Sequence, residues 1–308
     1  MSELTVILDQ KDMVVTLDSD TVRVDRPGCQ LQRIPINMIS RLIVKGNPMV
    51  SCGVWRALAE KNIPVTLLPL RGKGSAAYVG SGLSMSVEKR TAQHKAIHEE
   101  KTVLAISRWL LSLKLKGQES VLEKLSDNSD VSEPVRKYRA DIQKADNRNS
   151  LMGYEGSAAS HYFKMISTLI PGEWKFKGRN RRPPKDPVNA LLSLSYTIAG
   201  GEVSRAIQDT GLDPAAGFLH ISQNGRESLM LDVLEPLRPK TDWFVFQLLG
   251  KNVSPKDFTT GKKDGCFLNK KGRKAYYAAW SAWQEADEND NSLKKFAKEI
   301  INEMVRYF

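Results

Sequence analysis

With 308 residues, 41% of them apolar and 26% charged, the chain has the composition of a globular protein and the length of two ordinary domains. It contains no stretch of about 18 apolar residues and no basic and apolar leader at its start, so a membrane protein is excluded and we expect a cytoplasmic one. The net charge of +11 favours a polyanionic partner, either nucleic acid or anionic lipid.

The first part of the chain, from residue 4 to about residue 80, is predicted to be rich in β-strands. Short β-branched runs separated by turn residues indicate these strands, among them TVIL, MVVTL, TVRV and RLIVKG. A short helix is expected from Gly53 to Lys61, ending before Pro64, and a buried strand from Val65 to Leu68. No GxGxxG motif or P-loop follows a strand, so nucleotide binding by those motifs is unsupported.

Small residues mark the expected linker to a second domain: Gly80, Ser81, Gly82 and Ser84. One long helix, from about Val87 to Leu125, is predicted to open that domain because apolar residues recur at helical spacings. These apolar residues are Val103, Ile106, Leu110, Leu113 and Val121. The polar run at 124–133 predicts a loop, and a helix with small residues on one side is expected at 151–170.

Further helices are predicted toward the end of the chain. Asp186 followed by Pro187 suits the N-cap and first position of a helix, because proline lacks an amide hydrogen that is unpaired there anyway. Another helix is expected from about residue 227 to residue 234, before Pro236 interrupts it. The tail, 269–308, is expected to be helical with a break near EADENDN.

Together these elements predict an α+β fold. A small N-terminal β-rich domain (residues 1–84) is joined by a short linker to a larger all-α C-terminal domain (residues 85–308). Cys29, Cys52 and Cys266 are an odd number at wide spacings, which suits neither a disulfide framework nor a CxxC metal knuckle. We expect these cysteines to be reduced and mostly buried.

One group of residues has the chemistry of half a metal site. On a helix, Asp232 and Glu235 lie three residues apart and share a face, while His220 arrives from the loop before it. Carboxylate oxygens suit Mg²⁺, and an imidazole nitrogen shifts the preference toward Mn²⁺. The alternatives are a solvated helix face for the two acids and a cap or surface role for the histidine.

Glu155 is the candidate for a third acidic ligand. It lies among small residues that allow another helix to approach closely, and an ionised carboxylate buried there requires a metal or a charged partner. These small neighbours are Gly153, Gly156, Ser157, Ala158 and Ala159. The alternative is that Glu155 caps a helix or pairs with an arginine.

The basic run KFKGRNRRPPK, residues 175–185, is a candidate nucleic-acid contact. Trp174 and Phe176 interleave with Lys175, Lys177 and Arg179, a pattern that favours phosphate contact combined with base stacking, as in single-strand binders. The alternative is an ordinary solvated loop.

In series, these motifs resemble those of CRISPR-associated protein one, the family of integrases that insert new spacers into CRISPR arrays. The similar segments, in the family's order, are GYEGSAASHYF, FKGRNRRPPKDPVNALLSLSY and HISQNGRESLMLDVLEPLRPKTD. Others are NIPVTLLPLRGKGSAAYVG, the long helix with KLKGQ, and FLNKKGRKAYY, so the resemblance covers nearly the whole chain. One departure is Leu194-Ser195, where many members carry a pair with glycine before the tyrosine.

The resemblance implies a Mg²⁺ or Mn²⁺ cofactor held by Glu155, His220 and Glu235, with Asp232 as a nearby acid that assists catalysis or ligates. It also implies contacts with DNA from the basic run and its neighbours. These DNA-binding residues are Lys175, Lys177, Arg179, Arg181, Arg182, Asn189 and Arg238.

The activity implied by the resemblance is integration of protospacer DNA, in which a 3′-hydroxyl attacks a phosphodiester at the edge of a CRISPR repeat. The implied assembly is a homodimer formed through the β domains, with two dimers enclosing a dimer of CRISPR-associated protein two in a heterohexamer. Two alternatives remain open. One is a structure-selective, metal-dependent DNA nuclease that uses water, and the other is a non-catalytic nucleic-acid-binding module.

Overall fold

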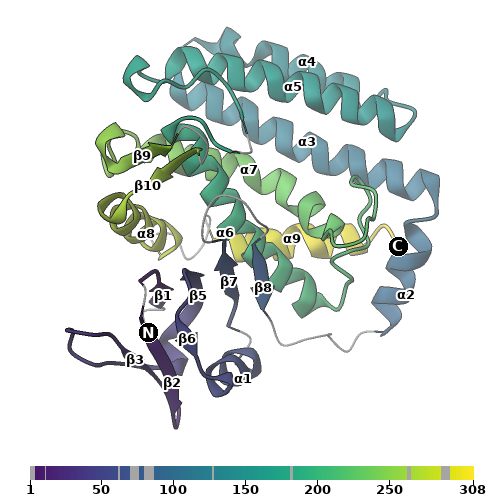
Figure 1. The fold of residues 1–308 in the computed structure, drawn as a ribbon. Coiled ribbons are helices and arrows are strands. Elements are labelled where there is room, and N and C mark those ends of the chain that lie inside the picture. Colours follow the sequence, from purple (N-terminus) through teal and green to yellow (C-terminus); the bar gives the residue numbers. More distant parts are fainter. Residues whose placement is uncertain are drawn as a thin grey trace. The chain divides into compact units, whose positions relative to one another are not determined.

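The computed structural model divides the chain into two compact units, Met1–Met85 and Ser86–Phe308 (Figure 1). It describes residues 4–10, 12–61, 63–69, 76–79, 87–126, 128–180, 183–261, 265–285 and 292–308. The expected linker residues Gly80, Ser81, Gly82 and Ser84 lie outside these ranges. No helix in the described ranges is long and apolar enough to cross a membrane.

The described strands of the N-terminal unit form two four-stranded sheets, with orders β1-β5-β7-β8 and β4-β3-β2-β6. In the first sheet β1, β5 and β7 are parallel and β8 is antiparallel, whereas in the second β2, β3 and β4 are antiparallel and β6 runs parallel to β2. The elements are β1 (Leu4–Leu8), β2 (Val14–Asp18), β3 (Thr21–Asp25), β4 (Gln32–Pro35), β5 (Ile39–Lys45), β6 (Met49–Val50), α1 (Cys52–Glu60), β7 (Val65–Leu68) and β8 (Ala77–Val79). The β-rich start, the short helix α1 and the strand from Val65 to Leu68 agree with the sequence-based prediction.

The C-terminal unit is mostly helical, which confirms the predicted α+β class. Its helices are α2 (Val87–Ala96), α3 (Glu100–Leu125), α4 (Glu133–Ile142), α5 (Arg148–Leu169), α6 (Pro187–Thr210), α7 (Ser228–Leu248), α8 (Lys270–Glu285) and α9 (Leu293–Val305). An antiparallel hairpin of β9 (Phe258–Gly261) and β10 (Gly265–Leu268) was not predicted, since the sequence-based expectation was an all-α domain. As predicted, the tail is helical on both sides of residues 286–291, which lie outside the described residues.

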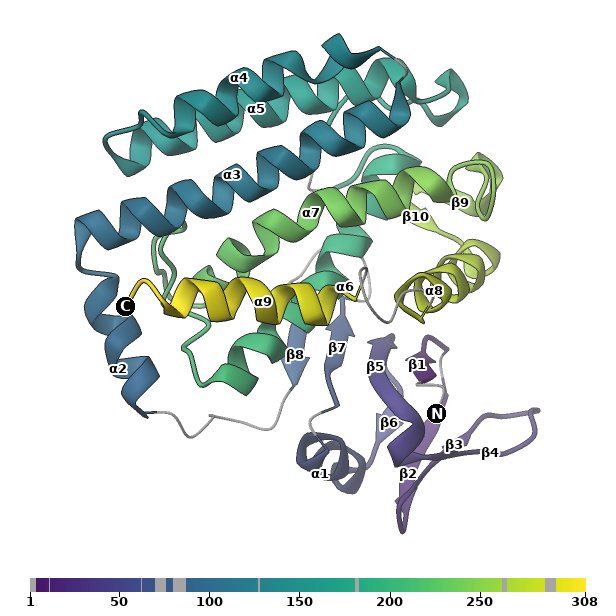
Figure 2. The ribbon, with the colours of Figure 1, turned by 180° about the vertical axis from the view of Figure 1, so that it is seen from behind.

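Helix α7 occupies the middle of this unit. It packs against α3 on one side and α6 on another, and α9 lies along both α6 and α7 (Figure 2). Helices α3, α4 and α5 lie side by side as a further layer (Figures 1 and 2). The functional side chains described below therefore come from packed helices and from the loops that join them.

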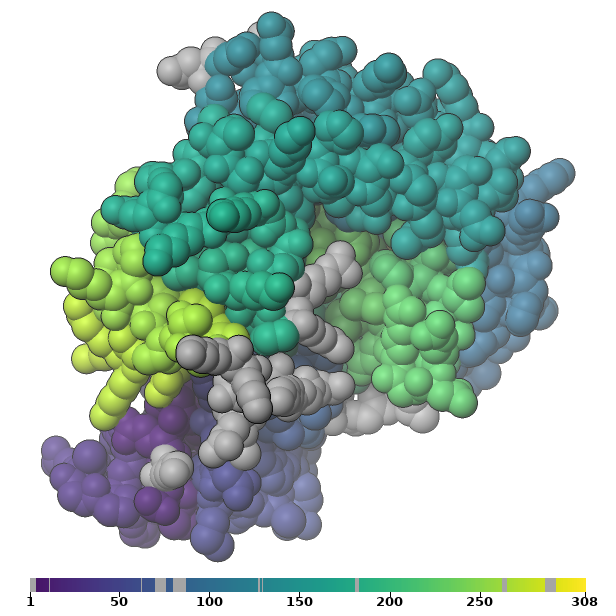
Figure 3. Space-filling view, turned by 45° about the horizontal axis from the view of Figure 1, so that its top comes forward, coloured from purple at the N-terminus to yellow at the C-terminus, as the bar shows by residue number. Residues whose placement is uncertain are grey.

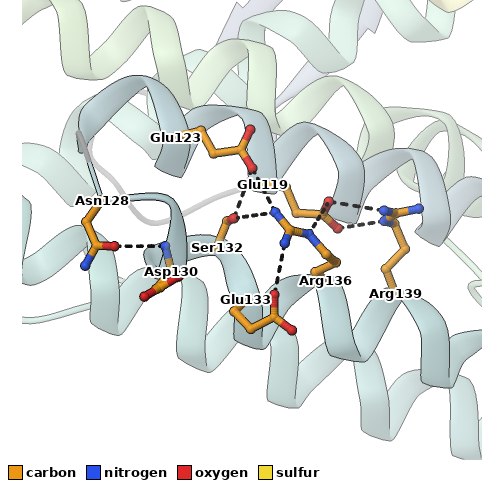
Figure 4. A network of polar contacts seen from close by, with 8 residues as sticks. All are labelled: Glu119, Glu123, Asn128, Asp130, Ser132, Glu133, Arg136 and Arg139. Carbon is orange, nitrogen blue, oxygen red and sulfur yellow. Dashed lines mark hydrogen bonds and ion pairs between the residues drawn. The ribbon is translucent and has the colours of Figure 1, made fainter.

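Ion pairs between arginines of α4 and glutamates of α3 link these two helices (Figure 4). Arg139 binds the buried Glu119 through Nε at 2.6 Å, and Arg136 contacts Glu123 at 3.2 Å and Glu133 at 2.9 Å. Because α5 packs on both α3 and α4, this network helps to hold the helix that carries Glu155.

The prediction of a single helix over residues 87–125 is wrong, because the helix is interrupted between Ala96 and Glu100. Tight backbone bonds from the amides of His98 and Glu99 to residues three positions earlier end α2. The buried Gln93 side chain donates to the carbonyls of Asp213 and Ala216, at 2.9 and 2.7 Å. These tertiary bonds tie α2 to a distant loop, a constraint that helical periodicity does not reveal.

The expected interruption at Pro236 is also wrong, since α7 continues through both Pro236 and Pro239. A proline inside a helix removes one hydrogen bond and crowds the preceding turn, so its surroundings must compensate. Here both prolines are buried, and Pro239 packs against Gly117 of α3. A Cβ atom added at Gly117 would lie 2.8 Å from the Pro239 Cβ, so glycine is what allows this close approach.

Two local predictions have different outcomes. The Asp186 side chain accepts a hydrogen bond from the Asn189 amide at 2.9 Å, with Pro187 at the first helical position, as predicted for the start of α6. The cysteines are free, but only Cys266 is buried, whereas Cys29 and Cys52 are exposed. The expectation of mostly buried thiols is therefore wrong.

Candidate metal centre

Two carboxylates from different helices meet at one buried lysine. Lys114 of α3 forms an ion pair with Glu155 of α5, and its Nζ lies 2.6 Å from Glu235 Oε2 of α7. The side chains are 5% exposed for Lys114, 16% for Glu155 and 7% for Glu235. We call Lys114, Glu155 and Glu235 the carboxylate cradle.

The electrostatics of the cradle keep Lys114 and Glu235 charged. Burial alone would raise the pKa of Glu235, but Arg238 and Lys114 favour the ionised form and lower its pKa to about 2. For Lys114, burial lowers the pKa, yet Glu235 and Glu155 outweigh this effect and raise it above its ordinary value. The cradle therefore holds anionic oxygens next to a cation at neutral pH.

Asp232 positions His220. The carboxylate of Asp232 is fully buried and accepts backbone hydrogen bonds from Phe218, Leu219 and His220, at 2.5, 2.9 and 2.8 Å. Its Oδ1 also lies 2.7 Å from His220 Nδ1. An Nδ1–H that donates to a carboxylate leaves the Nε2 lone pair of a neutral imidazole for a metal or a proton.

A further buried carboxylate, Asp242, supports the arginine beside the cradle. Asp242 accepts hydrogen bonds from Tyr196 and, at 3.1 Å, from Tyr162. Burial raises the pKa of Asp242 to about 6, although both tyrosine hydroxyls oppose the shift. Arg238 lies over the Tyr196 ring at 4.7 Å from its centroid, and its Nε lies 3.1 Å from Glu235 Oε1.

The basic loop presents its lysines, not its aromatic rings. Lys175 and Lys177 are exposed, whereas Trp174 and Phe176 are 1% and 6% exposed. Trp174 packs edge-on against Phe258, and Phe176 packs edge-on against Phe163. The expected base stacking by Trp174 and Phe176 is therefore wrong, because these rings anchor the loop to the core.

Other residues predicted to bind DNA have different surroundings. Asn189 is fully buried and bonds to the basic loop itself. Its amide nitrogen donates to the Gly178 carbonyl at 2.9 Å, and its Oδ1 accepts from Arg179 at 2.8 Å. Arg179 and Arg238 are partly buried beside Tyr196. Arg181 and Arg182 lie outside the described residues.

Of the five small residues near Glu155, three face solvent, whereas Ala158 is fully buried. Gly153, Gly156 and Ser157 are exposed, and a Cβ at either glycine would meet nothing within 4 Å. The expected close approach of another helix is therefore wrong for these three residues, whereas Ala158 is buried and α5 packs against both α3 and α4. In Figure 3 the teal surface that includes α5 and the green surface of the loop before α7 appear on the same face of the C-terminal unit.

The cradle and His220 have the donor types that a hard divalent cation requires. In the described part of the chain, no three His, Cys, Asp or Glu side chains already stand close enough to enclose a metal ion. However, Glu155 and Glu235 converge on one cationic nitrogen, and His220 acts electrostatically on Glu235. Two carboxylates and one imidazole fit Mn²⁺ or Mg²⁺.

Lys114, Tyr196 and Asp242 were not predicted from the sequence as residues of this site. Lys114 did carry a signal, because it lies one helical turn after Leu110 and next to Leu115, among positions that are buried in α3. A lysine at such a position requires a buried anion. Tyr196 and Asp242 carried no comparable signal, since tyrosine and aspartate occur often on helix surfaces.

The family model described as CRISPR associated protein Cas1 matches residues 6–282. The chain is 30% identical to CRISPR-associated endonuclease Cas1 1 of Thermodesulfovibrio yellowstonii, over 97% of this chain and 98% of that protein.

Solved structures share the fold. A casposase bound to integration product has a TM-score of 0.84 at 19% identity and covers 100% of this chain and 92% of its own. A chain of a Cas6-RT-Cas1–Cas2 complex has a TM-score of 0.81 at 20% identity, matching 99% of this chain and 35% of the longer one.

The Asp232 arrangement predicts an order of stability losses. Asp232→Asn turns one acceptor into a donor that faces backbone amides, so we expect unfolding free energy to fall by about 3 kcal/mol. His220→Ala removes only the partly exposed ring, and we expect a loss of roughly 1 kcal/mol. Urea unfolding measures both, and a larger loss for His220→Ala would contradict the positioning role of Asp232.

Proposed function

The chain belongs to the Cas1 family of CRISPR-associated proteins, and from this membership we propose that it is a metal-dependent DNA integrase. It joins the 3′-hydroxyl of a protospacer strand to a phosphodiester at the edge of a CRISPR repeat. The observation that carries the proposal is the convergence of Glu155 and Glu235 on one buried cation, beside a histidine whose orientation Asp232 sets.

In this reaction one phosphodiester replaces another. A bond forms between the attacking 3′-oxygen and phosphorus, the bond from phosphorus to the leaving oxygen breaks, the attacking hydroxyl loses a proton and the leaving oxygen gains one. A similar bond is made and broken, so no nucleotide hydrolysis is required. The site has to align the strands and neutralise the developing charge.

Glu155, Glu235 and His220 are the residues that would hold Mg²⁺ or Mn²⁺. When bound, such a cation stabilises negative charge on the reacting phosphate and on the leaving oxygen. Asp232 keeps His220 in the tautomer that leaves Nε2 open, so Asp232 acts through the histidine and not as a ligand. Its carboxylate oxygens already accept three backbone hydrogen bonds.

The DNA backbone is held by basic side chains around this centre. Lys175 and Lys177 project from an anchored loop, and Arg238 stands beside the cradle, supported by Tyr196. Contacts of this kind bind phosphates and position the strands without reading sequence. Arg179, Arg181 and Arg182 belong to the same proposed DNA contact.

A homodimer formed through the N-terminal unit is part of the proposal. Val14 of β2 pairs in register with Met49 of β6, and these apolar side chains are 43% and 73% exposed. An exposed apolar pair on a sheet suits burial against a second copy. We further propose assembly with CRISPR-associated protein two, supported by the similarity to a chain of the Cas6-RT-Cas1–Cas2 complex.

Glu155→Gln tests the metal-dependent joining reaction. Loss of one anionic ligand should lower joining roughly a hundredfold or more, while DNA affinity stays within a few-fold. The assay mixes the protein with CRISPR-associated protein two, Mn²⁺, a labelled protospacer with free 3′-hydroxyls and a supercoiled plasmid carrying a CRISPR repeat. Glu299→Gln, at an exposed position of α9, is the matched control and should join like the wild type.

The same gel distinguishes the alternatives. Plasmid cleavage without joined label would favour a structure-selective nuclease that uses water at the same site. Binding without cleavage or joining would favour a non-catalytic binding module. Joining by Glu155→Gln at the wild-type rate would contradict the assignment of Glu155 as a ligand.

The double variant Lys175→Ser, Lys177→Ser tests the basic loop. If each lysine neutralises one phosphate, the slope of log affinity against log salt should fall by about 2 for duplex DNA. Fluorescence anisotropy across a salt series measures this slope. Lys137→Ser with Lys251→Ser removes the same charge from other exposed positions. An equal effect of this control would show that only total charge matters.

Met49→Asp tests the dimer. A charge placed in a buried apolar contact should weaken self-association at least tenfold. Sedimentation velocity across protein concentrations reports the change, and Gln32→Glu, at an exposed position of β4, provides the control. Unaltered self-association of Met49→Asp would move the interface elsewhere.

A further inference from the structure

The carboxylate cradle is already neutralised by the protein's own cations. Lys114 contacts Glu155 and Glu235, and Arg238 contacts Glu235 through its Nε at 3.1 Å. These four groups carry two negative and two positive charges. Three of the four side chains are 15% exposed or less, so water screens this balance only weakly.

A divalent cation entering this balanced cluster would leave a net charge of about plus two in a largely buried place. Such an excess is unfavourable in a medium of low dielectric constant. A DNA phosphate carries the opposite charge and removes part of the excess. Binding of metal and binding of phosphate are then coupled, and each favours the other.

Lys114 is the group on which this coupling depends. Its ammonium contacts both expected ligand carboxylates, which lie on two different helices. Without it, two buried carboxylates would face each other unneutralised on that side, a strong site for a free divalent cation.

We propose that Lys114 is a built-in counter-ion that holds Glu155 and Glu235 together before the metal binds and keeps metal affinity low until a DNA phosphate is present. The inference rests on the proposed function, in which these glutamates are metal ligands. It deepens that function by making cation loading depend on substrate. The protein then holds a tightly bound metal mainly when DNA occupies the site.

The test is a titration of the full-length protein with MnCl₂, followed by the electron paramagnetic resonance signal of free Mn²⁺. It is done with and without a short DNA duplex carrying free 3′-hydroxyls. For the wild type, we expect the duplex to tighten Mn²⁺ binding on the order of tenfold. Lys114→Met should tighten Mn²⁺ binding without DNA by roughly tenfold or more, and the effect of DNA should shrink.

Two further variants separate charge from shape. Lys114→Arg retains the charge and should restore the wild-type dependence on DNA. Lys116→Met, at an exposed position of the same helix, should bind Mn²⁺ like the wild type. Should Lys114→Met fail to fold, Lys114→Gln removes the charge while retaining a hydrogen-bond donor, and the same tightening is required of it.

Each failure has a separate meaning. Suppose that Glu155→Gln loses Mn²⁺ binding, whereas Lys114→Met or Lys114→Gln binds Mn²⁺ with unchanged affinity. This result would overturn the role of Lys114 and leave the proposed function intact. Absence of Mn²⁺ binding to the wild type, with and without DNA, would overturn the proposed function and this inference together. Tighter binding in Lys116→Met as well would show a general charge effect and also overturn the inference.

Discussion

A buried lysine between two buried carboxylates is the contact on which the rest of the site depends. An ionised side chain inside a protein requires a partner of opposite charge, and Lys114 meets this requirement for Glu155 and Glu235 together. It thereby joins α3, α5 and α7 at one point. Gly117, one turn further along α3, lets the Pro239 turn of α7 come close enough for this contact.

Around this point, residues that neither bind metal nor contact DNA in the proposed reaction hold in place the residues that do. Asp232 orients His220 by accepting hydrogen bonds from the Nδ1 of its ring and from three backbone amides. Asp242 accepts a hydrogen bond from Tyr196, whose ring lies under the guanidinium of Arg238. Trp174 anchors the loop that carries Lys175. Groups held by packed helices and buried rings need little reorganisation when a substrate arrives, which is the condition for effective electrostatic catalysis.

Local signals in the sequence predicted what depends on local physics. The β-rich start, the strand from Val65 to Leu68 and the Asp186-Pro187 helix start follow from propensity and capping alone. The continuation of α7 through Pro236, the break before Glu100 and the burial of Trp174 depend on tertiary contacts. The carboxylate pair was suggested by the chemistry of its residue types, but its lysine was missed because periodicity does not reveal which charges meet.

The metal site can be tested directly by anomalous X-ray scattering from a crystal of the protein with Mn²⁺ and a DNA duplex. We expect an anomalous peak at Glu155, Glu235 and His220 Nε2, with Asp232 still bonded to His220 Nδ1 and Lys114 no longer bridging both carboxylates. A crystal in which Lys114 still spans Glu155 and Glu235 at saturating Mn²⁺, with manganese absent or bound elsewhere, would contradict the proposed metal site.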